Sequence, residues 1–266
     1  MPRAFKLSGV TFSQTGLPNL FDPSFLGANL LGWWAADQGV TVNGSNQVTA
    51  WNDLSGAGNT LGNATPGSAL VYVNPAQNNL PAMAPPTVSH TGTGYWLQTP
   101  ATVPAFNFAG NTPFSLFTVF RRQPEPSGLE TILCNNPSIA FGGWQFFTGN
   151  QYGGTMGFKF TSSTGAYLVH GSTVLQTGVA YNIVLTYSGG NTAANLQIYV
   201  NGVAETMTVV TNTTLGTITN GPLIVGGYGG NFVDSDYICE AAITNDVLTA
   251  AQIASLNTYA TQKWAA

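Results

Sequence analysis

The sequence contains few charged residues. Only 6% of its 266 residues are Asp, Glu, Lys or Arg, against roughly 25% in an average globular domain. Six basic and ten acidic residues give a formal net charge of −4. This composition offers no basic patch for phosphates, so it argues against binding to nucleic acid or to anionic membranes. The surface must instead be hydrated by Asn, Thr, Ser, Gln and Gly, as is common on extracellular and virion proteins.

Cysteines and long hydrophobic runs are also scarce. Cys134 and Cys239 are the two cysteines, and a single pair makes neither a metal cluster nor a disulfide framework. The longest apolar run, residues 26–36, spans about 11 residues, too few to cross a bilayer. No signal peptide is visible, so we expect a protein made in the host cytoplasm without membrane insertion. Release as part of a phage particle would be one route to the outside.

Motifs of common enzymes are missing. His90 and His170 have no G-x-S-x-G elbow, H-E-x-x-H pair or nearby cysteine beside them. The sequence also has no G-x-x-x-x-G-K-[ST] loop for a nucleotide. Serine-hydrolase, metalloenzyme and nucleotide-dependent chemistry therefore have no support.

Short strand-like runs recur from residue 30 onward, separated by Gly, Pro and Asn. They include residues 47–51, 69–73, 95–98, 114–121, 131–134, 144–147, 156–160, 166–170, 181–187 and 196–200. This spacing predicts a β-sandwich or barrel. Apolar and polar residues alternate over 181–187, which predicts a strand with one buried face. No repeat or linker divides residues 30–266, so we predict one domain there.

Two local signals define the end of this domain. Asn201-Gly202 predicts a type I′ hairpin that sets Val200 opposite Val203 and Leu196 opposite Met207. A capping box at residues 249–252 predicts a helix that begins at about Ala250. Four residues form the apolar stripe by which this helix would pack on the sandwich: Ile253, Leu256, Ala260 and Trp264.

Residues 1–29 are rich in turn formers and show no sustained hydrophobic period. We predict an irregular N-terminal arm over this range. The arm would either dock on a neighbouring subunit or form a loose tail, because chain ends are often poorly ordered.

Several segments resemble concanavalin A-like, laminin-G-like domains of bacterial and phage proteins. Gly32-Trp33-Trp34-Ala35-Ala36-Asp37-Gln38-Gly39-Val40 and residues 48–59 are similar to the opening of such domains. The Asn-Gly hairpin and residues 240–264 are similar to their later strands and closing helix. The resemblance covers residues 30–266. It implies an all-β, two-sheet antiparallel jelly-roll sandwich with one short C-terminal helix, used to bind sugars or proteins and sometimes to hydrolyse glycans.

Hydrolytic members of that family carry Glu-x-Asp-x-Glu on one strand, with the catalytic carboxylates about 5–5.5 Å apart in retaining enzymes. This sequence has no such triplet, and its four glutamates, Glu125, Glu130, Glu205 and Glu240, are isolated. We therefore predict a protein that is not an enzyme. Two carboxylates on adjacent strands would be the alternative. Glu240 is expected to hold the closing strand through hydrogen bonds.

Calcium is the cofactor that the residues fit best, because the resemblance includes calcium-binding relatives and hard cations prefer oxygen ligands. Asp234, Asp236 and Asn231 are the candidate ligands. These aspartates could equally cap turns or hydrate a loop. Asp37 and Asp53 lie in the segments that carry the resemblance, and we expect them to fix Asx turns.

A sugar site would need exposed aromatic rings for stacking and polar groups for hydroxyls. Tyr152 and Tyr228 lie next to glycine pairs and are the leading candidates, with Trp144 and Phe232 beside them. Packing is the alternative role of these rings. The remaining tryptophans of the domain are expected in the core: Trp33, Trp34, Trp51 and Trp264.

These observations predict a non-enzymatic structural protein of a phage virion surface, such as a capsid decoration, head-fibre or tail-associated protein. Residues 1–29 would dock on other capsid or tail proteins, and the lectin-like domain would face outward and could contact cell-surface glycans. A homo-oligomer would cover exposed sheet edges. The alternative is a bacterial carbohydrate-binding or adhesion module, extracellular or on the cell surface, with a shallow site at Tyr152, Tyr228 and the Asp234–Asp236 loop. A glycan hydrolase is the third hypothesis.

Overall fold

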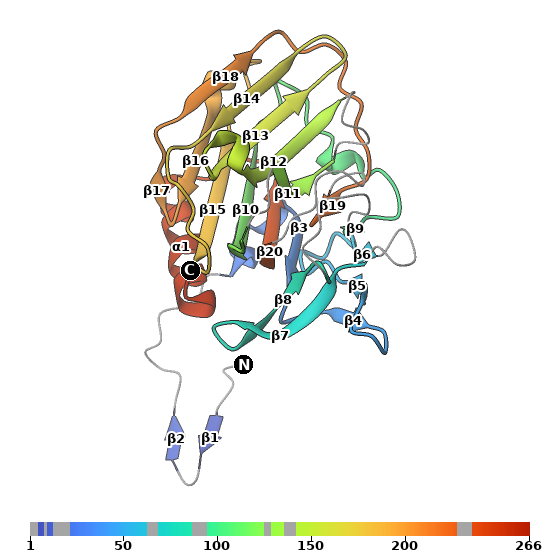
Figure 1. The fold of residues 1–266 in the computed structure, drawn as a ribbon, viewed down its shortest axis with the longest axis vertical. Coiled ribbons are helices and arrows are strands. Elements are labelled where there is room, and N and C mark those ends of the chain that lie inside the picture. The colour runs from blue at the N-terminus through green and yellow to red at the C-terminus, as the bar shows by residue number, and fades with distance from the viewer. Residues whose placement is uncertain are drawn as a thin grey trace.

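The computed structural model describes residues 22–62, 69–86, 95–124, 129–135, 142–227 and 236–266, together with the backbone of two short strands, residues 5–7 and 10–12. The described chain forms two antiparallel β-sheets packed face to face, with an α-helix, α1, beside the first sheet (Figure 1). The predicted all-β sandwich with a C-terminal helix is confirmed.

The first sheet has the order β17-β16-β15-β10-β20-β8-β7, and β3 also pairs with β20. Its strands are β17 (Val203–Ala204), β16 (Leu196–Val200), β15 (Ala180–Tyr187), β10 (Phe114–Arg121), β20 (Tyr237–Thr244), β8 (Leu80–Ala84), β7 (Val71–Gln77) and β3 (Leu30–Ala35). Strand β10 pairs with β15 on one side and β20 on the other, so it lies at the centre of this sheet.

The second sheet has the order β18-β14-β13-β12-β11-β19-β9-β6-β5-β4. Its strands are β18 (Thr208–Asn212), β14 (Ala166–His170), β13 (Thr155–Thr161), β12 (Gly143–Gly149), β11 (Leu129–Cys134), β19 (Ile224–Val225), β9 (Leu97–Gln98), β6 (Leu61–Gly62), β5 (Val48–Trp51) and β4 (Val40–Val42). Four 3₁₀ turns are described: η1 (Pro23–Asn29), η2 (Pro104–Phe106), η3 (Asn150–Tyr152) and η4 (Ala193–Asn195).

Aromatic side chains fill the space between the sheets. Phe108 stacks on Phe114 with ring centroids 4.1 Å apart, and Phe114 also contacts Phe158 and Phe160 of the facing sheet. The tryptophans predicted to be in the core, Trp33, Trp34, Trp51 and Trp264, are all buried. Cys134 and Cys239 are both buried, and they do not form a disulfide with each other.

The sequence prediction for residues 181–187 needs one correction, because this strand is buried on both faces. Tyr187 lies opposite Phe114 in the sheet, so the odd-numbered side chains of β15 face the core between the sheets. The even-numbered ones lie under α1 (Ala250–Trp264), where Asn182 donates a hydrogen bond to Asn257. The alternating pattern therefore marks two different buried surroundings rather than core and solvent.

The hairpin and the capped helix form where the sequence places them. Asn201 and Gly202 both have positive φ, and Val200 pairs with Val203. Strand β17 ends at Ala204, so the expected pair of Leu196 and Met207 is not in the ladder. The capping box of Thr249 and Gln252 is present. The stripe of Ile253, Leu256, Ala260 and Trp264 is buried as predicted, together with Tyr259.

Part of the predicted N-terminal arm belongs to the packed domain. In η1, Pro23 and Leu26 are buried, and the carbonyl of Asn29 accepts a hydrogen bond from the backbone of Asn245. Residues Pro23–Asn29, which the sequence analysis assigns to the arm, therefore pack with the domain. Strands β1 (Phe5–Leu7) and β2 (Val10–Phe12) pair with each other as a separate two-stranded sheet. The rest of residues 1–21 lies outside the described residues, and docking by this segment stays a prediction.

Candidate functional site

A polar cavity of about 370 Å³ opens at the end of the sandwich where β10 begins and β15 ends. Three loops form it: residues 107–111 before β10, the turn at Asn191 after β15, and residues 215–220 between β18 and β19. Its side chains are mainly amides and apolar groups: Asn107, Asn111, Asn191, Asn220, Phe108, Leu215 and Ile218. We call this cavity the asparagine pocket.

The backbone of Gly110 joins two of these loops. Its carbonyl accepts hydrogen bonds from the Tyr187 hydroxyl and, at 2.9 Å, from the backbone N–H of Asn191. Burial raises the pKa of Tyr187 to about 12, so this hydroxyl keeps its proton and stays a donor. A Cβ on Gly110 would lie 2.7 Å from Asn191 Oδ1 and 2.9 Å from Leu215 Cδ1. A side chain at this position would therefore shift the ends of two lining side chains and change the shape of the pocket.

The third loop is anchored to the core through Asn220. Its Oδ1 accepts a 2.8 Å hydrogen bond from Asn135 Nδ2, which also donates to the carbonyl of Phe106. Asn135 Oδ1 in turn accepts from the backbone N–H of Trp144. Because Asn135 and Trp144 are both fully buried, this chain of bonds holds one wall of the pocket on a rigid base.

Asn107 lies in the loop before β10. Its Oδ1 is buried, and no residue of the described chain donates a hydrogen bond to it. An unsatisfied buried polar atom costs roughly 1–3 kcal/mol. A ligand in the pocket would instead meet the exposed side chains of Asn111 and Asn191.

The asparagine pocket is electrically neutral, since none of its lining side chains is acidic, basic or a histidine. Amides offer both donors and acceptors, and they bind neutral polar groups without the desolvation cost of a charge. Leu215 and Ile218 are half-buried and give the same cavity an apolar side. This combination is suited to a small uncharged polar ligand that also carries apolar surface.

The predicted aromatic sugar site is only partly described. Tyr152 is half-buried, its ring stacks on His170 at 5.3 Å, and it contacts Phe147. Burial raises the pKa of its hydroxyl. One face of this ring is therefore already covered by His170, which fits the packing alternative. Tyr228 and Phe232 lie outside the described residues, and their role stays a prediction.

Trp144 requires a correction. Its side chain is 0% exposed, and its indole N–H donates to the carbonyl of Phe106 at 3.0 Å. Its ring also stacks between Phe108 and Phe158. A fully buried ring offers no face to a sugar, so Trp144 serves the core.

Of the predicted calcium ligands, Asp236 is described and Asn231 and Asp234 are not. The Asp236 side chain is fully buried and accepts hydrogen bonds from Arg122 at 3.1 Å and from the backbone of Gln123 at 2.8 Å. Its carboxylate thus faces a guanidinium, a cation that the chain itself supplies. No cluster of three or more metal-ligating side chains occurs in the described part of the chain. Calcium binding stays a prediction.

Glu130, predicted to be isolated, shares Arg122 with Asp236. Arg122 Nη1 contacts the carboxylate of Glu130 and also donates to Thr148. These contacts join the end of β10 to β11, β12 and the start of β20. Because the side chains of Glu130 and Asp236 are 0% exposed, a substrate has no access to this pair. The cluster connects the two sheets.

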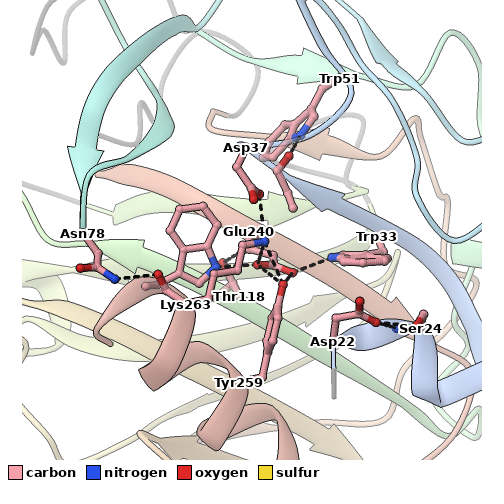
Figure 2. Close-up of polar contacts among 12 residues, drawn as sticks. Asp22, Ser24, Trp33, Asp37, Trp51, Asn78, Thr118, Glu240, Tyr259 and Lys263 are labelled. Carbon is pink, nitrogen blue, oxygen red and sulfur yellow. Dashed lines mark hydrogen bonds and ion pairs between the residues drawn. The ribbon is translucent and has the colours of Figure 1, made fainter. Parts of the chain in front are cut away.

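Glu240 forms a second buried centre (Figure 2). Its carboxylate accepts hydrogen bonds from the indoles of Trp33 and Trp264, both at 2.6 Å, and from Tyr259 at 2.9 Å. Lys263 reaches it at 3.3 Å and also pairs with Asp37 at 2.8 Å. Burial raises the pKa of Glu240, while Lys263 and the other donors oppose that shift. The predicted structural role of Glu240 is confirmed, since it ties β20 to β3 and α1.

The two aspartates of the opening segments behave differently. Asp53 accepts hydrogen bonds at 2.9 Å from the backbone N–H groups of Trp33, Ser55 and Asn59, as expected of an Asx turn. Asp37 was expected to do the same, but its side chain instead pairs with Lys263. Lys263, in the last turn of α1, lies beside Asp37, and this ion pair replaces the expected Asx turn.

The asparagine pocket has no recognisable motif in the sequence. Its four asparagines come from three loops up to 113 positions apart, and no motif connects them. The available signal was weak: Gly110-Asn111, Gly190-Asn191 and Asn220-Gly221 each place an asparagine beside a glycine. Such pairs indicate turns, but not which turns meet in space.

The fold and the sequence define the class of protein. A family model described as the concanavalin A-like lectin/glucanases superfamily matches residues 91–254, and the chain belongs to this family. No curated protein matches the sequence. Within the described residues, no helix is both long and apolar enough to span a bilayer.

Solved structures share the fold at low sequence identity. The binding domain of Paraclostridial Mosquitocidal Protein 1 aligns with a TM-score of 0.59 and 14% identity, over 86% of this chain and 52% of that chain. The botulinum neurotoxin type G receptor binding domain aligns with a TM-score of 0.56 and 13% identity, over 87% of this chain and 51% of that chain. A third similar structure is domain 4 of AbnA, a GH43 extracellular arabinanase from Geobacillus stearothermophilus, in complex with arabinotriose. It aligns with a TM-score of 0.55 and 14% identity, over 86% of this chain and 98% of that chain. The chain spans about half of each toxin structure.

Proposed function

We propose that this chain is a non-catalytic, lectin-like module that binds an uncharged glycan in the asparagine pocket. The observation that carries the proposal is a neutral cavity of about 370 Å³ lined by four asparagines. Sugars present many hydroxyls that donate and accept at once, and amide side chains match both functions. Binding through hydroxyls alone would need neither a charged residue nor a metal ion.

The structural comparisons support a binding role. Two of the similar structures are described as binding or receptor-binding domains of toxins, and the third is a domain of an arabinanase in complex with arabinotriose. At 13–14% identity these likenesses concern the fold. They supply a precedent for a sandwich of this kind in binding, and the site must carry the specific proposal.

The positions of the acidic residues favour a module without catalytic activity. Glu130, Asp236 and Glu240 are buried and engaged with Arg122 or with the donors around α1. Glu205 accepts hydrogen bonds from the backbone of Ser172 and Thr173. Neither the asparagine pocket nor a second cavity of about 200 Å³, near Gln123 and Asn150, is lined by a carboxylate. Most retaining or inverting glycoside hydrolases use two carboxylates at one groove.

A glycan array with two matched variants tests the binding proposal. Asn191→Gly removes a pocket amide, and glycine tolerates the positive φ of 55° at this position. Asn46→Gly is the control, because Asn46 is also exposed with a φ of 57° but lies in a turn away from the pocket. We expect the wild type and Asn46→Gly to bind the same glycans in calcium and in chelator, and Asn191→Gly to lose at least about tenfold in affinity. Equal binding by all three proteins would contradict the proposal.

We further propose that the module is displayed on a phage virion and docks on capsid or tail proteins through its N-terminal residues. The weakly charged, polar composition and the separate β1–β2 sheet support this setting. A homo-oligomer is part of the proposal, because edge strand β18 leaves Val209 and Val210 nearly half exposed. A bacterial adhesion module is the alternative.

Deletion of residues 1–21 tests the virion proposal, because the shortened chain keeps η1 and every strand of the two large sheets. We expect the shortened protein to fold and bind glycan but to be absent from purified particles. Incorporation at the wild-type level would contradict docking through this segment.

A further inference from the structure

We infer that Lys263 and Asp37 form an intramolecular isopeptide bond, which joins the last turn of α1 covalently to the segment after β3. Lys263 Nζ lies 2.8 Å from Asp37 Oδ1 and 3.3 Å from Glu240 Oε2. An amine, a carboxyl group and a second, fully buried carboxyl group therefore meet at one point (Figure 2). These are the groups that amide formation needs: a nucleophile, an electrophilic carbon and a group that transfers protons.

The amine of Lys263 is held directly beside the carboxyl group of Asp37. Asp37 Oδ1 is buried, and no residue of the described chain donates a hydrogen bond to it, although Nζ lies 2.8 Å away. The amine therefore contacts this carboxyl group without the alignment of a hydrogen bond. Because Cγ is one bond of about 1.2 Å from Oδ1, Nζ is within about 4 Å of the carbon that it would attack. Well-oriented groups held this close react with effective molarities of up to roughly 10⁵–10⁸ M.

The surroundings of Lys263 fix the amine and keep water away from it. Nζ donates a 2.9 Å hydrogen bond to the hydroxyl of Tyr259 and lies over the rings of Tyr259 and Trp264, at 5.3 and 4.8 Å from their centroids. The lysine side chain is 12% exposed. Its flexible stem has thus already lost most of its freedom before any reaction. A site of low polarity also favours the neutral amine and carboxyl group over the ion pair.

Glu240 is placed to transfer the protons. Its side chain is 0% exposed, and hydrogen bonds from Trp33, Trp264 and Tyr259 fix its carboxyl group. Burial raises the pKa of Glu240, so it holds a proton at a pH where an exposed glutamate has lost it. The nitrogen of Lys263 contacts both carboxyl groups, which lets Glu240 exchange protons with the reacting atoms.

The reaction is a condensation that releases water. Transfer of one proton from Lys263 to Asp37 gives a neutral amine and a neutral carboxyl group. The nitrogen lone pair forms the bond to Cγ, and one electron pair of the C=O bond moves to oxygen. Glu240 donates its proton to the hydroxyl oxygen, the C–O bond breaks and water leaves. The C=O bond forms again, and Glu240 takes the surplus proton from nitrogen. The products are an amide and one water molecule, with no oxidant or reductant required.

This bond would close a ring that contains most of the described domain, from Asp37 to Lys263. A covalent closure of this kind stabilises the fold mainly by restricting the unfolded chain, as a disulfide does. Cys134 and Cys239 do not supply such a closure, since they form no disulfide with each other. The bond would form whether or not the asparagine pocket binds a sugar.

The intact mass of the purified, folded and then denatured protein tests the bond. We expect a mass about 18 Da below the value calculated from the sequence, which is the mass of one water molecule. Trypsin cleaves after lysine and arginine, so a digest locates the bond. Fragments 7–121 and 160–266 should stay joined, and the chain should not be cleaved after Lys263. A full calculated mass would overturn the inference, and so would a loss of mass without joined fragments.

Variants assign the roles of the three groups. Lys263→Arg keeps the charge but lacks the amine, so it should show its full calculated mass; Lys159→Arg is the matched control and should keep the loss. Asp37→Asn should still form the amide, with release of ammonia in place of water. Glu240→Gln should lower the joined fraction at least about tenfold after the same time. Joined fragments in Lys263→Arg would contradict the bond, and a wild-type rate in Glu240→Gln would contradict the proton transfer. The wild-type mass decides the bond even if a variant fails to fold.

Discussion

The indole of Trp264 donates a 2.6 Å hydrogen bond to the carboxylate of Glu240, which joins the last turn of α1 to the middle of β20. On the opposite side the same carboxylate accepts the indole of Trp33, in β3. One buried acidic residue therefore ties together three elements from the two ends of the described domain. This arrangement explains why a protein so poor in charge retains a glutamate in its interior.

Glu240→Gln is expected to destabilise the domain by about 3 kcal/mol. The amide has one acceptor oxygen where the carboxylate has two, and its NH₂ group would face indole donors. Chemical denaturation with urea measures the change. Asp37→Asn, at the more exposed end of the same network, is the control and should cost less than half as much. Equal losses in the two variants would contradict a central role of Glu240.

The raised pKa of Glu240 predicts how the stability difference between the wild type and Glu240→Gln depends on pH. Because burial lifts the pKa above its ordinary value of 4.5, the folded state binds the proton more tightly than the unfolded state. The associated stabilisation is complete below the unfolded pKa and is lost as the pH rises through the folded pKa. We therefore expect the advantage of the wild type over Glu240→Gln to be largest near pH 4 and to shrink as the pH rises above this value. An advantage that grows over this range would indicate a lowered pKa.

Arg122→Met is expected to cost about 3–5 kcal/mol, because it removes the guanidinium that two buried carboxylates share. The triple variant with Glu130→Gln and Asp236→Asn removes the negative charges as well. It should recover more than half of the loss, as measured by urea denaturation. A triple variant no more stable than Arg122→Met would show that the charges are not the cause.

Tyr152→Leu should leave glycan affinity unchanged and lower stability by about 1 kcal/mol, since the ring stacks on His170. Isothermal titration and thermal melting measure the two effects separately. A large loss of affinity at unchanged stability would restore the aromatic site that the sequence suggests.

The sequence predicted the features that are encoded locally. The Asn201-Gly202 turn and the Thr249–Gln252 capping box depend on neighbouring residues, and both occur as expected. The role of Trp144 could not be read this way, because the Phe106 carbonyl that binds its indole lies 38 positions away. The same holds for Asp37, whose partner Lys263 comes from the far end of the chain.

The asparagine pocket also depends on residues that are far apart in the sequence, and it was even harder to predict than these single contacts. A search for exposed aromatic rings is reasonable for a sugar-binding protein, but it passes over a pocket built from amides. Asn107 and Asn220 look like ordinary loop residues in the sequence. They become a site because β10, β15 and the segment before β19 bring three loops to one end of the sandwich.

A crystal structure of the protein with a glycan selected on the array tests the central claim most directly. We predict electron density for a sugar in the asparagine pocket, within hydrogen-bond distance of the side chain of Asn111 or Asn191. A glycan bound at another surface, with the asparagine pocket occupied by water alone, would contradict the account.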